Sequence, residues 1–203
     1  VGLMRDLYRE FGYQEVITPQ VFDVELFKTS GHFQNYRENM YFAAIDKSAQ
    51  KEVIEGADER QASMKPMNCP SHCLMFAAEK HSYRDLPLRV ADFGRLHRFE
   101  RSGVMHGLTR VRTFCQDDAH IFCRPDQMQA EIVDFMKLTM KTYEILGMTE
   151  FKLLVATRPE NRMGSDEVWD QAEGALMKGL ESLGLKYGIS PGDGAFYGPK
   201  VEI

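Results

Sequence analysis

Several hallmarks of other protein classes are missing from this sequence of 203 residues. No run of about 18 apolar residues occurs, which argues against a transmembrane helix, and the first residues lack the apolar core of a secretory signal. Four cysteines are too few for a disulfide-rich secreted domain. We therefore expect a protein of the reducing cytoplasm, and its 43% hydrophobic and 27% charged residues suit a globular fold.

An excess of positive charge is missing too, because the net charge is −5. This argues against a generally basic nucleic-acid binder. Residues 84–112 differ, since they hold seven arginines, no lysine and three carboxylates, so this window is +4 and the rest of the chain −9. Arginine has a planar fork that binds phosphate or carboxylate at two points. The window predicts a local polyanion site, with a solvated charged face as the alternative.

The stretch Leu88–Phe122 predicts a long antiparallel hairpin, because two alternating segments flank a loop of small and polar residues. Side chains of one parity share a face of a strand. The even-numbered residues of the second strand are Arg110, Arg112, Phe114, Gln116, Asp118 and His120. The odd-numbered residues are mostly apolar or small and are expected in a core. Phe114 among charged residues indicates a planar ligand on this face, while an ordinary solvated face remains the alternative.

Hydrophobic periodicity predicts the other elements of the chain. Helices are expected at Leu3–Phe11, Val24–Lys28, Cys69–His81, Arg124–Leu146 and Asp166–Leu183. Strands are expected at Tyr13–Thr18, Met40–Ile45 and Phe151–Thr157. Residues 46–61 are highly charged and predict an exposed insertion without chemistry.

The string HRFERSG leading into TRVRTF resembles motif 2 of class II aminoacyl-tRNA synthetases. The strings MNCP, LPLR and QDDAHIFC resemble the threonine-specific members of that family. The N-terminal helix, strand and proline resemble motif 1, which forms the dimer interface in the family. The resemblance implies an α+β fold with a mainly antiparallel sheet flanked by helices. It also implies that residues 1–203 are a partial catalytic domain in which motif 3 has no counterpart.

The same resemblance implies the roles of individual residues. The implied catalytic residues are Arg98, His32 and Lys200, and the implied ATP-binding residues are Arg98, Glu100, Arg110 and Phe114. The implied threonine-binding residues are Met67, Gln116, Asp118 and Tyr197, and the implied zinc ligands are Cys69 and His120. The implied cofactors and partners are Zn²⁺, Mg²⁺ with ATP, threonine, tRNA(Thr) and a second copy of the chain. One departure from the family string KPMNCPGH is Ser71 in place of its glycine.

The implied activity is a threonine–tRNA ligase that forms threonyl-adenylate and passes the acyl group to tRNA. Because motif 3 and a third zinc ligand have no counterpart here, we expect weak activity from these residues alone. One alternative is a non-catalytic synthetase-like module that binds an amino acid or nucleotide. Another is a structural zinc protein built on Cys69, His72 and Cys73. Otherwise Cys73, Cys115 and Cys123 are interpreted as buried small apolar residues.

Overall fold

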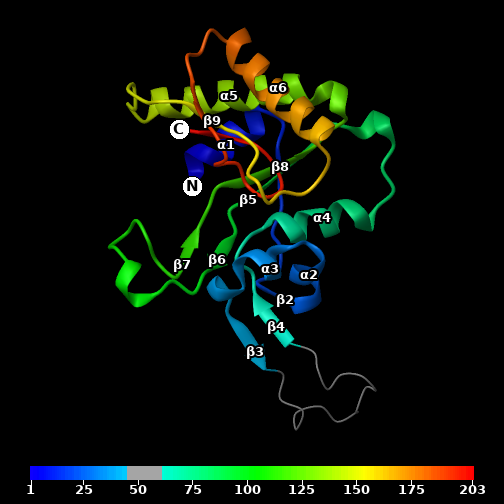
Figure 1. The fold of residues 1–203 in the computed structure, drawn as a ribbon, viewed down its shortest axis with the longest axis vertical. Helices are drawn as coiled ribbons and strands as arrows, with labels where there is room; N and C mark the ends of the chain where they lie inside the picture. The colour runs from blue at the N-terminus through cyan, green and yellow to red at the C-terminus, as the bar shows by residue number, and fades with distance from the viewer. Residues whose placement is uncertain (45–60) are drawn as a thin grey trace. The chain divides into compact units, whose positions relative to one another are not determined.

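The computed structural model describes residues 1–44 and 61–203 of the chain. The predicted insertion at 46–61 therefore lies outside the described residues, apart from Gln61 in a strand. In chain order the described helices and strands are α1 Gly2–Glu10, β1 Gln14–Glu15, β2 Val21–Asp23, α2 Val24–Thr29, α3 His32–Tyr36, β3 Phe42–Ala44, β4 Gln61–Met64, α4 Cys69–Ala78, β5 Leu88–Asp92, β6 Arg95–His97, β7 Thr113–Cys115, β8 Asp118–Phe122, α5 Met128–Ile145, β9 Leu154–Ala156, α6 Asp166–Ser182, β10 Gly188–Ser190 and β11 Lys200–Glu202 (Figure 1).

These elements form two compact units. The first unit consists of Val1, Gln14–His81 and Arg89–His120. The second unit consists of Gly2–Tyr13, Ser82–Leu88 and Ile121–Ile203. Whether residues 1–203 are one partial catalytic domain, as the sequence predicts, stays a prediction.

Small sheets make up the framework of the first unit. Strand β5 lies between β1 and β8 and runs parallel to β1. Strand β4 lies between β2 and β3 and is antiparallel to both, and β6 pairs antiparallel with β7. Buried apolar side chains such as Phe27, Val90 and Leu96 fill the interior. The strands are short, so the packing of side chains between sheets and helices has to hold them in place.

The predicted hairpin over Leu88–Phe122 is confirmed in outline but is not continuous. Its first arm is interrupted between β5 and β6, and its second arm between β7 and β8. Gly94 occupies the first interruption, where an added Cβ would lie 2.5 Å from Asn68 Oδ1. The glycine therefore lets a buried side chain approach the backbone. The two ends of the hairpin belong to different sheets, β5 and β8 to one and β6 and β7 to another.

The interruptions also change which side chains are covered. Thr113, Cys115 and Asp117 were expected in the core and are exposed, whereas Phe114 is half-buried. The alternation rule needs an unbroken strand, and β7 ends before β8 begins. The prediction that Cys73 and Cys115 are buried is wrong, since both are exposed, while Cys123 is half-buried.

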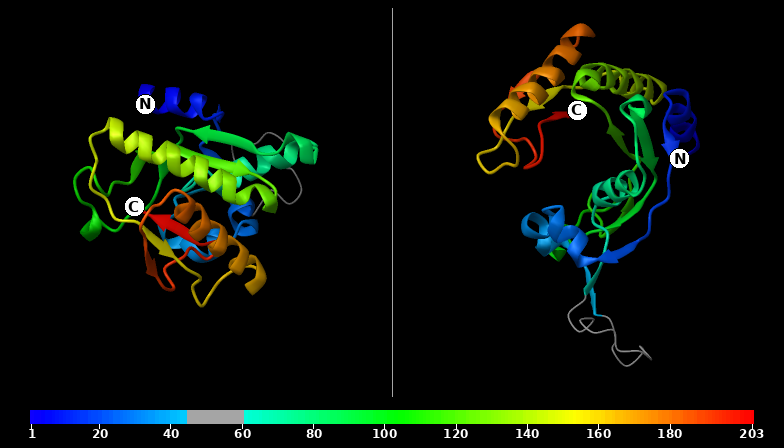
Figure 2. Two further views of the ribbon diagram at one scale, coloured as in Figure 1. Left: turned by 90° about the horizontal axis from the view of Figure 1, so that it is seen from above. Right: turned by 90° about the vertical axis from the view of Figure 1, so that its right-hand side faces the viewer.

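The second unit packs helices on a small mixed sheet. Strand β9 lies between β10, which is parallel to it, and β11, which is antiparallel. Helices α5 and α6 lie side by side (Figure 2). The buried centre consists of Met136, Leu153, Val155 and Leu180. Burial of one apolar face of each helix is what the helical periodicity predicts.

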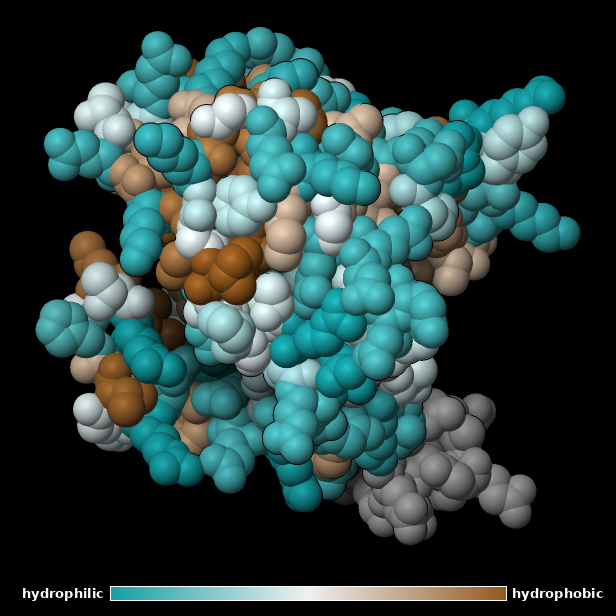
Figure 3. Space-filling view, turned by 45° about the horizontal axis from the view of Figure 1, so that its top comes forward, coloured by the Kyte–Doolittle hydropathy of each residue, from teal (hydrophilic) through white to brown (hydrophobic). Residues whose placement is uncertain are grey.

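The architecture is α+β, as predicted, with antiparallel pairs and two parallel pairs. The sequence did not predict α3, β2, β4 or β10. Among the described helices, none is long and apolar enough to cross a bilayer. In the face drawn in Figure 3, hydrophilic residues cover most of the surface with apolar patches between them.

Two glycines in α6 offer a matched test of the packing of α5 against α6. A Cβ at Gly179 would lie 2.8 Å from Cγ2 of Ile132, whereas a Cβ at Gly174 would meet nothing within 4 Å. We expect Gly174→Ala to stabilise the protein by about 0.5–1 kcal/mol through helix propensity. Gly179→Ala should destabilise it by about 1–3 kcal/mol through overpacking. Urea unfolding of both variants tests this, and equal stabilisation by both would contradict the close helix contact.

Candidate active site

Arg98 and Phe114 come together where the ladder between β6 and β7 ends. Leu96 lies opposite Phe114 in that ladder, and beyond it the Arg98 amide donates to the Arg112 carbonyl oxygen at 2.9 Å. The Arg98 guanidinium carbon lies 5.0 Å from the Phe114 ring centroid, which is a cation–π distance. Arg98 Nε also donates to the Pro66 carbonyl oxygen at 3.2 Å. The guanidinium group is therefore held in place by both a ring and a backbone carbonyl.

Glu100 lies between two further arginines of the same hairpin. Its side chain is only 10% exposed, and its Oε2 lies 3.3 Å from Nε of the more exposed Arg110. Arg112 donates from Nε at 3.0 Å and from Nη2 at 2.9 Å to the Glu100 carbonyl oxygen. Arg112 was expected on the ligand face. It fixes the Glu100 backbone instead, because the loop folds back on itself.

These side chains line a cavity of about 590 Å³ within the first unit. Its lining residues are Arg98, Glu100, Leu108, Thr109, Arg110, Val111, Phe114, Cys115 and Gln116. The volume is in the range of small-molecule sites. All the residues that were predicted to bind ATP line this cavity, together with Gln116, which was predicted to bind threonine. An aromatic face and two guanidinium groups can accept a planar base and phosphates.

Asp118 and its neighbours form a second group in the first unit. Asn68 is fully buried, and its Nδ2 donates to Asp118 Oδ2 at 3.1 Å. Met67, which precedes Asn68, is half-buried, and Gln116 is exposed. The orientation of Asp118 therefore depends on an amide that approaches the chain at Gly94.

Cys69 and His120 have the donor chemistry that zinc prefers, a thiol and an imidazole. Burial and the nearby Asp118 raise the pKa of the Cys69 thiol to about 11. Burial lowers the pKa of His120, against the opposing effect of Asp118. The carboxylate of Asp118 thus influences the pKa of both donors. Within residues 1–44 and 61–203, no group of three or more His, Cys, Asp or Glu is arranged to hold a metal ion. Two donors fit by chemistry, and a third would have to come from elsewhere.

His72 contacts His120 directly. The two Nδ1 atoms are 2.7 Å apart and the rings meet edge to face at 4.6 Å. His72 Nε2 lies 3.5 Å from Asp92 Oδ2. Because the carboxylate favours a proton on that nitrogen, we assign His72 Nδ1 as the acceptor and His120 Nδ1 as the donor. This leaves His120 Nε2 with its lone pair. His72 contacts Asp92 and His120, whereas Cys73 is exposed. These contacts do not support a structural zinc site that includes both His72 and Cys73.

His72 contacts a buried polar network for which the sequence predicted no role. Lys65 is fully buried, and its Nζ donates to Thr18 Oγ1 at 2.7 Å and lies 3.5 Å from Asp92 Oδ2. Thr18 Oγ1 donates to the same Asp92 oxygen at 2.8 Å. Ser71, which replaces the family glycine, donates to the Asn68 carbonyl oxygen at 2.6 Å. The sequence offered one sign of this network, because Lys65 and Asp92 lie within otherwise mostly apolar segments.

His32, an implied catalytic residue, is buried at the start of α3. Its Nδ1 lies 2.9 Å from Ser30 Oγ. Burial lowers the pKa of His32 below its usual value. The imidazole is therefore neutral at pH 7 and can act as a hydrogen-bond acceptor or donor.

Tyr197 and Lys200 belong to the second unit. Tyr197 is exposed and lies in a turn closed by a bridge between Ala195 and Gly198. Lys200 begins β11 and its Nζ pairs with Glu202. The turn is held at Gly194, whose amide donates to the Thr157 carbonyl oxygen at 2.8 Å.

Residues 50–203 match the core domain of class II tRNA synthetases (G, H, P, S and T). The chain belongs to the class II tRNA synthetase core-domain family. The resemblance that the motifs predicted is confirmed by similar sequences. A threonine–tRNA ligase from Bdellovibrio bacteriovorus is 62% identical over 98% of this chain and 29% of its own length. One from Bordetella avium is 52% identical with the same coverage.

Solved structures agree with the class II assignment. The RNA binding domain of threonyl-tRNA synthetase from Cryptosporidium parvum Iowa II is 46% identical with a TM-score of 0.86, over 98% of this chain and 47% of that one. A putative threonyl-tRNA synthetase from Aeropyrum pernix is 33% identical with a TM-score of 0.84, over 98% and 44%. The chain thus spans under a third of the length of the curated relatives described above.

The network behind His72 predicts a large effect of Asp92→Asn. The substitution leaves buried Lys65 without its counter-charge, so we expect a loss of about 3–5 kcal/mol of unfolding free energy. Asp134→Asn, at an exposed pair with Lys137, should cost at most about 0.5 kcal/mol. Chemical unfolding at pH 7 compares the two variants. Similar small losses would mean that the buried charge pair contributes little.

The same network predicts a dependence on pH. Burial alone would raise the pKa of Asp92, but its contacts with His72, Thr18 and Lys65 outweigh burial and hold the pKa below its usual value. A lowered carboxyl pKa contributes stability above the unfolded value, near pH 4, and that contribution is lost as the pH falls through the folded value. Stability measured from pH 6 to pH 2 should therefore fall less steeply in Asp92→Asn than in the wild type.

Proposed function

We propose that this chain supplies part of the catalytic core of a threonine–tRNA ligase that works in the cytoplasm. In the first step a threonine carboxylate oxygen attacks the α-phosphorus of ATP and pyrophosphate leaves. In the second step a terminal ribose hydroxyl of tRNA(Thr) attacks the acyl carbon and AMP leaves. The observation that supports this most directly is the cavity in which Arg98, Glu100, Arg110 and Phe114 converge.

The residues of the cavity suit ATP activation. Phe114 would stack on adenine, and the fork of Arg98 would bridge the α-phosphate and the threonine carboxylate. Arg110 is 58% exposed and pairs with Glu100 in the described state. A γ-phosphate carries more charge than one carboxylate, so it would draw Arg110 away. Glu100 would then be available to accept a hydrogen bond from the adenine amine. Mg²⁺ would accompany the triphosphate.

His32, Tyr197 and Lys200 complete the proposed set. The neutral imidazole of His32 would assist removal of the ribose hydroxyl proton during transfer. Tyr197 would contact threonine, and the ammonium group of Lys200 would stabilise negative charge on the adenylate. The motif 1 segment, with α1 and β1, would form a homodimer interface, as the family resemblance implies.

The group around Asp118 would select threonine. Valine is nearly isosteric with threonine, and shape alone separates such pairs by only about 10²-fold. A site that must bind the hydroxyl rejects the analogue lacking it by about 10⁴–10⁵-fold. Cys69 and His120, with a third ligand from elsewhere, would hold a zinc ion that keeps room to bind the threonine amine and hydroxyl. Asp118, held by Asn68, would accept a hydrogen bond from the threonine hydroxyl, and Met67 and Gln116 would line the pocket.

Two substitutions separate the ATP role from the threonine role. Arg110→Ala should raise the KM for ATP about tenfold or more and leave the preference for threonine over valine nearly unchanged. Asp118→Ala should reduce that preference by about 10²-fold or more, because the hydroxyl loses its acceptor. ATP–pyrophosphate exchange with threonine or valine measures the KM for ATP and the amino-acid preference. The assay uses the protein encoded by the longest reading frame that contains this chain. Asp117→Ala is the matched neighbouring control.

If both variants lose ATP and threonine equally with discrimination intact, the division of roles is wrong. Threonine binding without any exchange by the wild type would favour the alternative of a non-catalytic module.

Zinc binding has its own test. Cys69→Ala should lower zinc affinity about tenfold or more. Cys73→Ala, at an exposed thiol four residues further along α4, should leave it unchanged. Titration against a chelating dye measures the affinity without relying on activity. Equal losses in both variants would point to the structural zinc site, and no zinc binding by the wild type would remove the metal from the proposal.

A further inference from the structure

We propose that Trp169 and Arg158 are positioning residues that hold the turn carrying Tyr197 through backbone contacts at Met163 and Thr157. The proposal rests on the proposed function of Tyr197 and Lys200 and concerns the second unit. Arg158 and Met163 lie in the loop between β9 and α6, residues 157–165, and Trp169 lies in α6.

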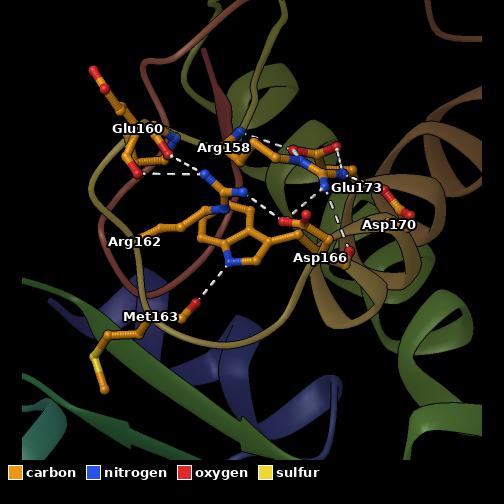
Figure 4. Close-up of polar contacts among 9 residues, drawn as sticks. Arg158, Glu160, Arg162, Met163, Asp166, Asp170 and Glu173 are labelled. Atoms are coloured by element: carbon orange, nitrogen blue, oxygen red, sulfur yellow. Dashed lines mark hydrogen bonds and ion pairs between the residues drawn. The ribbon is translucent and has the colours of Figure 1, made fainter.

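Met163 is held from both sides. Its amide donates to the Phe196 carbonyl oxygen at 2.7 Å, next to Tyr197. Its carbonyl oxygen accepts a hydrogen bond from Trp169 Nε1, also at 2.7 Å (Figure 4). Trp169 is 2% exposed and lies in the first turns of α6. Met163 thus connects the rigid helix α6 to the turn of Tyr197.

The rest of the loop is held against α6 by charge. Arg158 Nη2 lies 2.7 Å from Glu173 Oε2 and also pairs with Asp170, and its amide donates to Glu173 Oε1 at 2.8 Å. Arg162 pairs with Asp166 and donates to the Pro159 carbonyl oxygen. Figure 4 shows both guanidinium groups directed toward the carboxylates of α6. A fork that contacts several partners restricts the loop more than an isolated pair would.

The turn of Tyr197 meets this loop at a second point. The Gly194 amide donates to the Thr157 carbonyl oxygen at 2.8 Å, and a Cβ at Gly194 would lie 2.6 Å from that oxygen. Thr157 and Met163 therefore bracket the segment held by Arg158. Met163, Trp169, Tyr197 and neighbouring residues line a cavity of about 330 Å³. The position of Tyr197 relative to its cavity then depends on the loop.

The test compares two aromatic substitutions that each remove one donor and keep a ring. Trp169→Phe removes the donor to Met163. Tyr187→Phe removes a donor to Glu181, at 2.9 Å, near the other end of α6. Loss of one hydrogen bond typically changes an equilibrium constant about fivefold. We expect Trp169→Phe to raise the KM for threonine about fivefold with the KM for ATP nearly unchanged, and Tyr187→Phe to change neither.

Hydrogen exchange gives a readout that does not require activity. The amides of Met163 and Gly194 should exchange about fivefold faster in Trp169→Phe and at the wild-type rate in Tyr187→Phe. Arg158→Lys keeps the charge and loses the fork, so it should shift both readouts in the same direction by a smaller factor. If Trp169→Phe fails to fold, Arg158→Lys decides.

Unchanged exchange and KM, or equal rises in the KM for threonine and ATP, would overturn the positioning role. If the wild type shows no threonine-dependent activity, the proposed function fails. In that case the exchange rates alone decide whether the loop holds the turn.

Discussion

The buried pair of Lys65 and Asp92 is the interaction on which the first unit depends. Neither charge reaches water, so the desolvation cost has to be offset by contacts with Thr18 and His72. Thr18 follows β1, Lys65 follows β4, Asp92 ends β5 and His72 lies in α4. Strands of two to five residues bury too little to fix their own places. Directional polar contacts that are satisfied only in one arrangement supply what the short strands lack.

The same segment connects this network to the proposed ATP cavity. The Lys65 carbonyl oxygen accepts a hydrogen bond from the His97 amide at 3.1 Å, and the next residue, Pro66, accepts from Arg98 Nε at 3.2 Å. The buried lysine therefore fixes the backbone that meets the end of β6. On the other side, His72 fixes His120 through their Nδ1 contact. Residues proposed to bind ATP and residues proposed to select threonine are thus supported by one buried cluster within the first unit.

The sequence predicted what local patterns encode. Helical periodicity identified α5 and α6, and an aromatic residue among arginines identified the cavity around Phe114. The need for glycine at position 94 could not be predicted, because the side chain that approaches it there comes from Asn68, a distant part of the chain. The buried network was missed for the same reason, since Thr18 and Asp92 are 74 residues apart. Side chains whose burial follows from distant contacts leave little trace in alternation or composition.

The two arginines of the cavity differ in a way that suits adenylate formation. Arg98 is restrained by the Phe114 ring and the Pro66 carbonyl oxygen, so its guanidinium group is in place before a substrate arrives. Reaction at the α-phosphorus needs such fixed geometry, because groups that must reorganise during the reaction stabilise developing charge less well. Arg110 is more exposed and its partner, Glu100, is exchangeable. The γ-phosphate that it would bind leaves as part of pyrophosphate. Because Glu100 lies within reach, Arg110 can return to this carboxylate once the nucleotide has left the cavity.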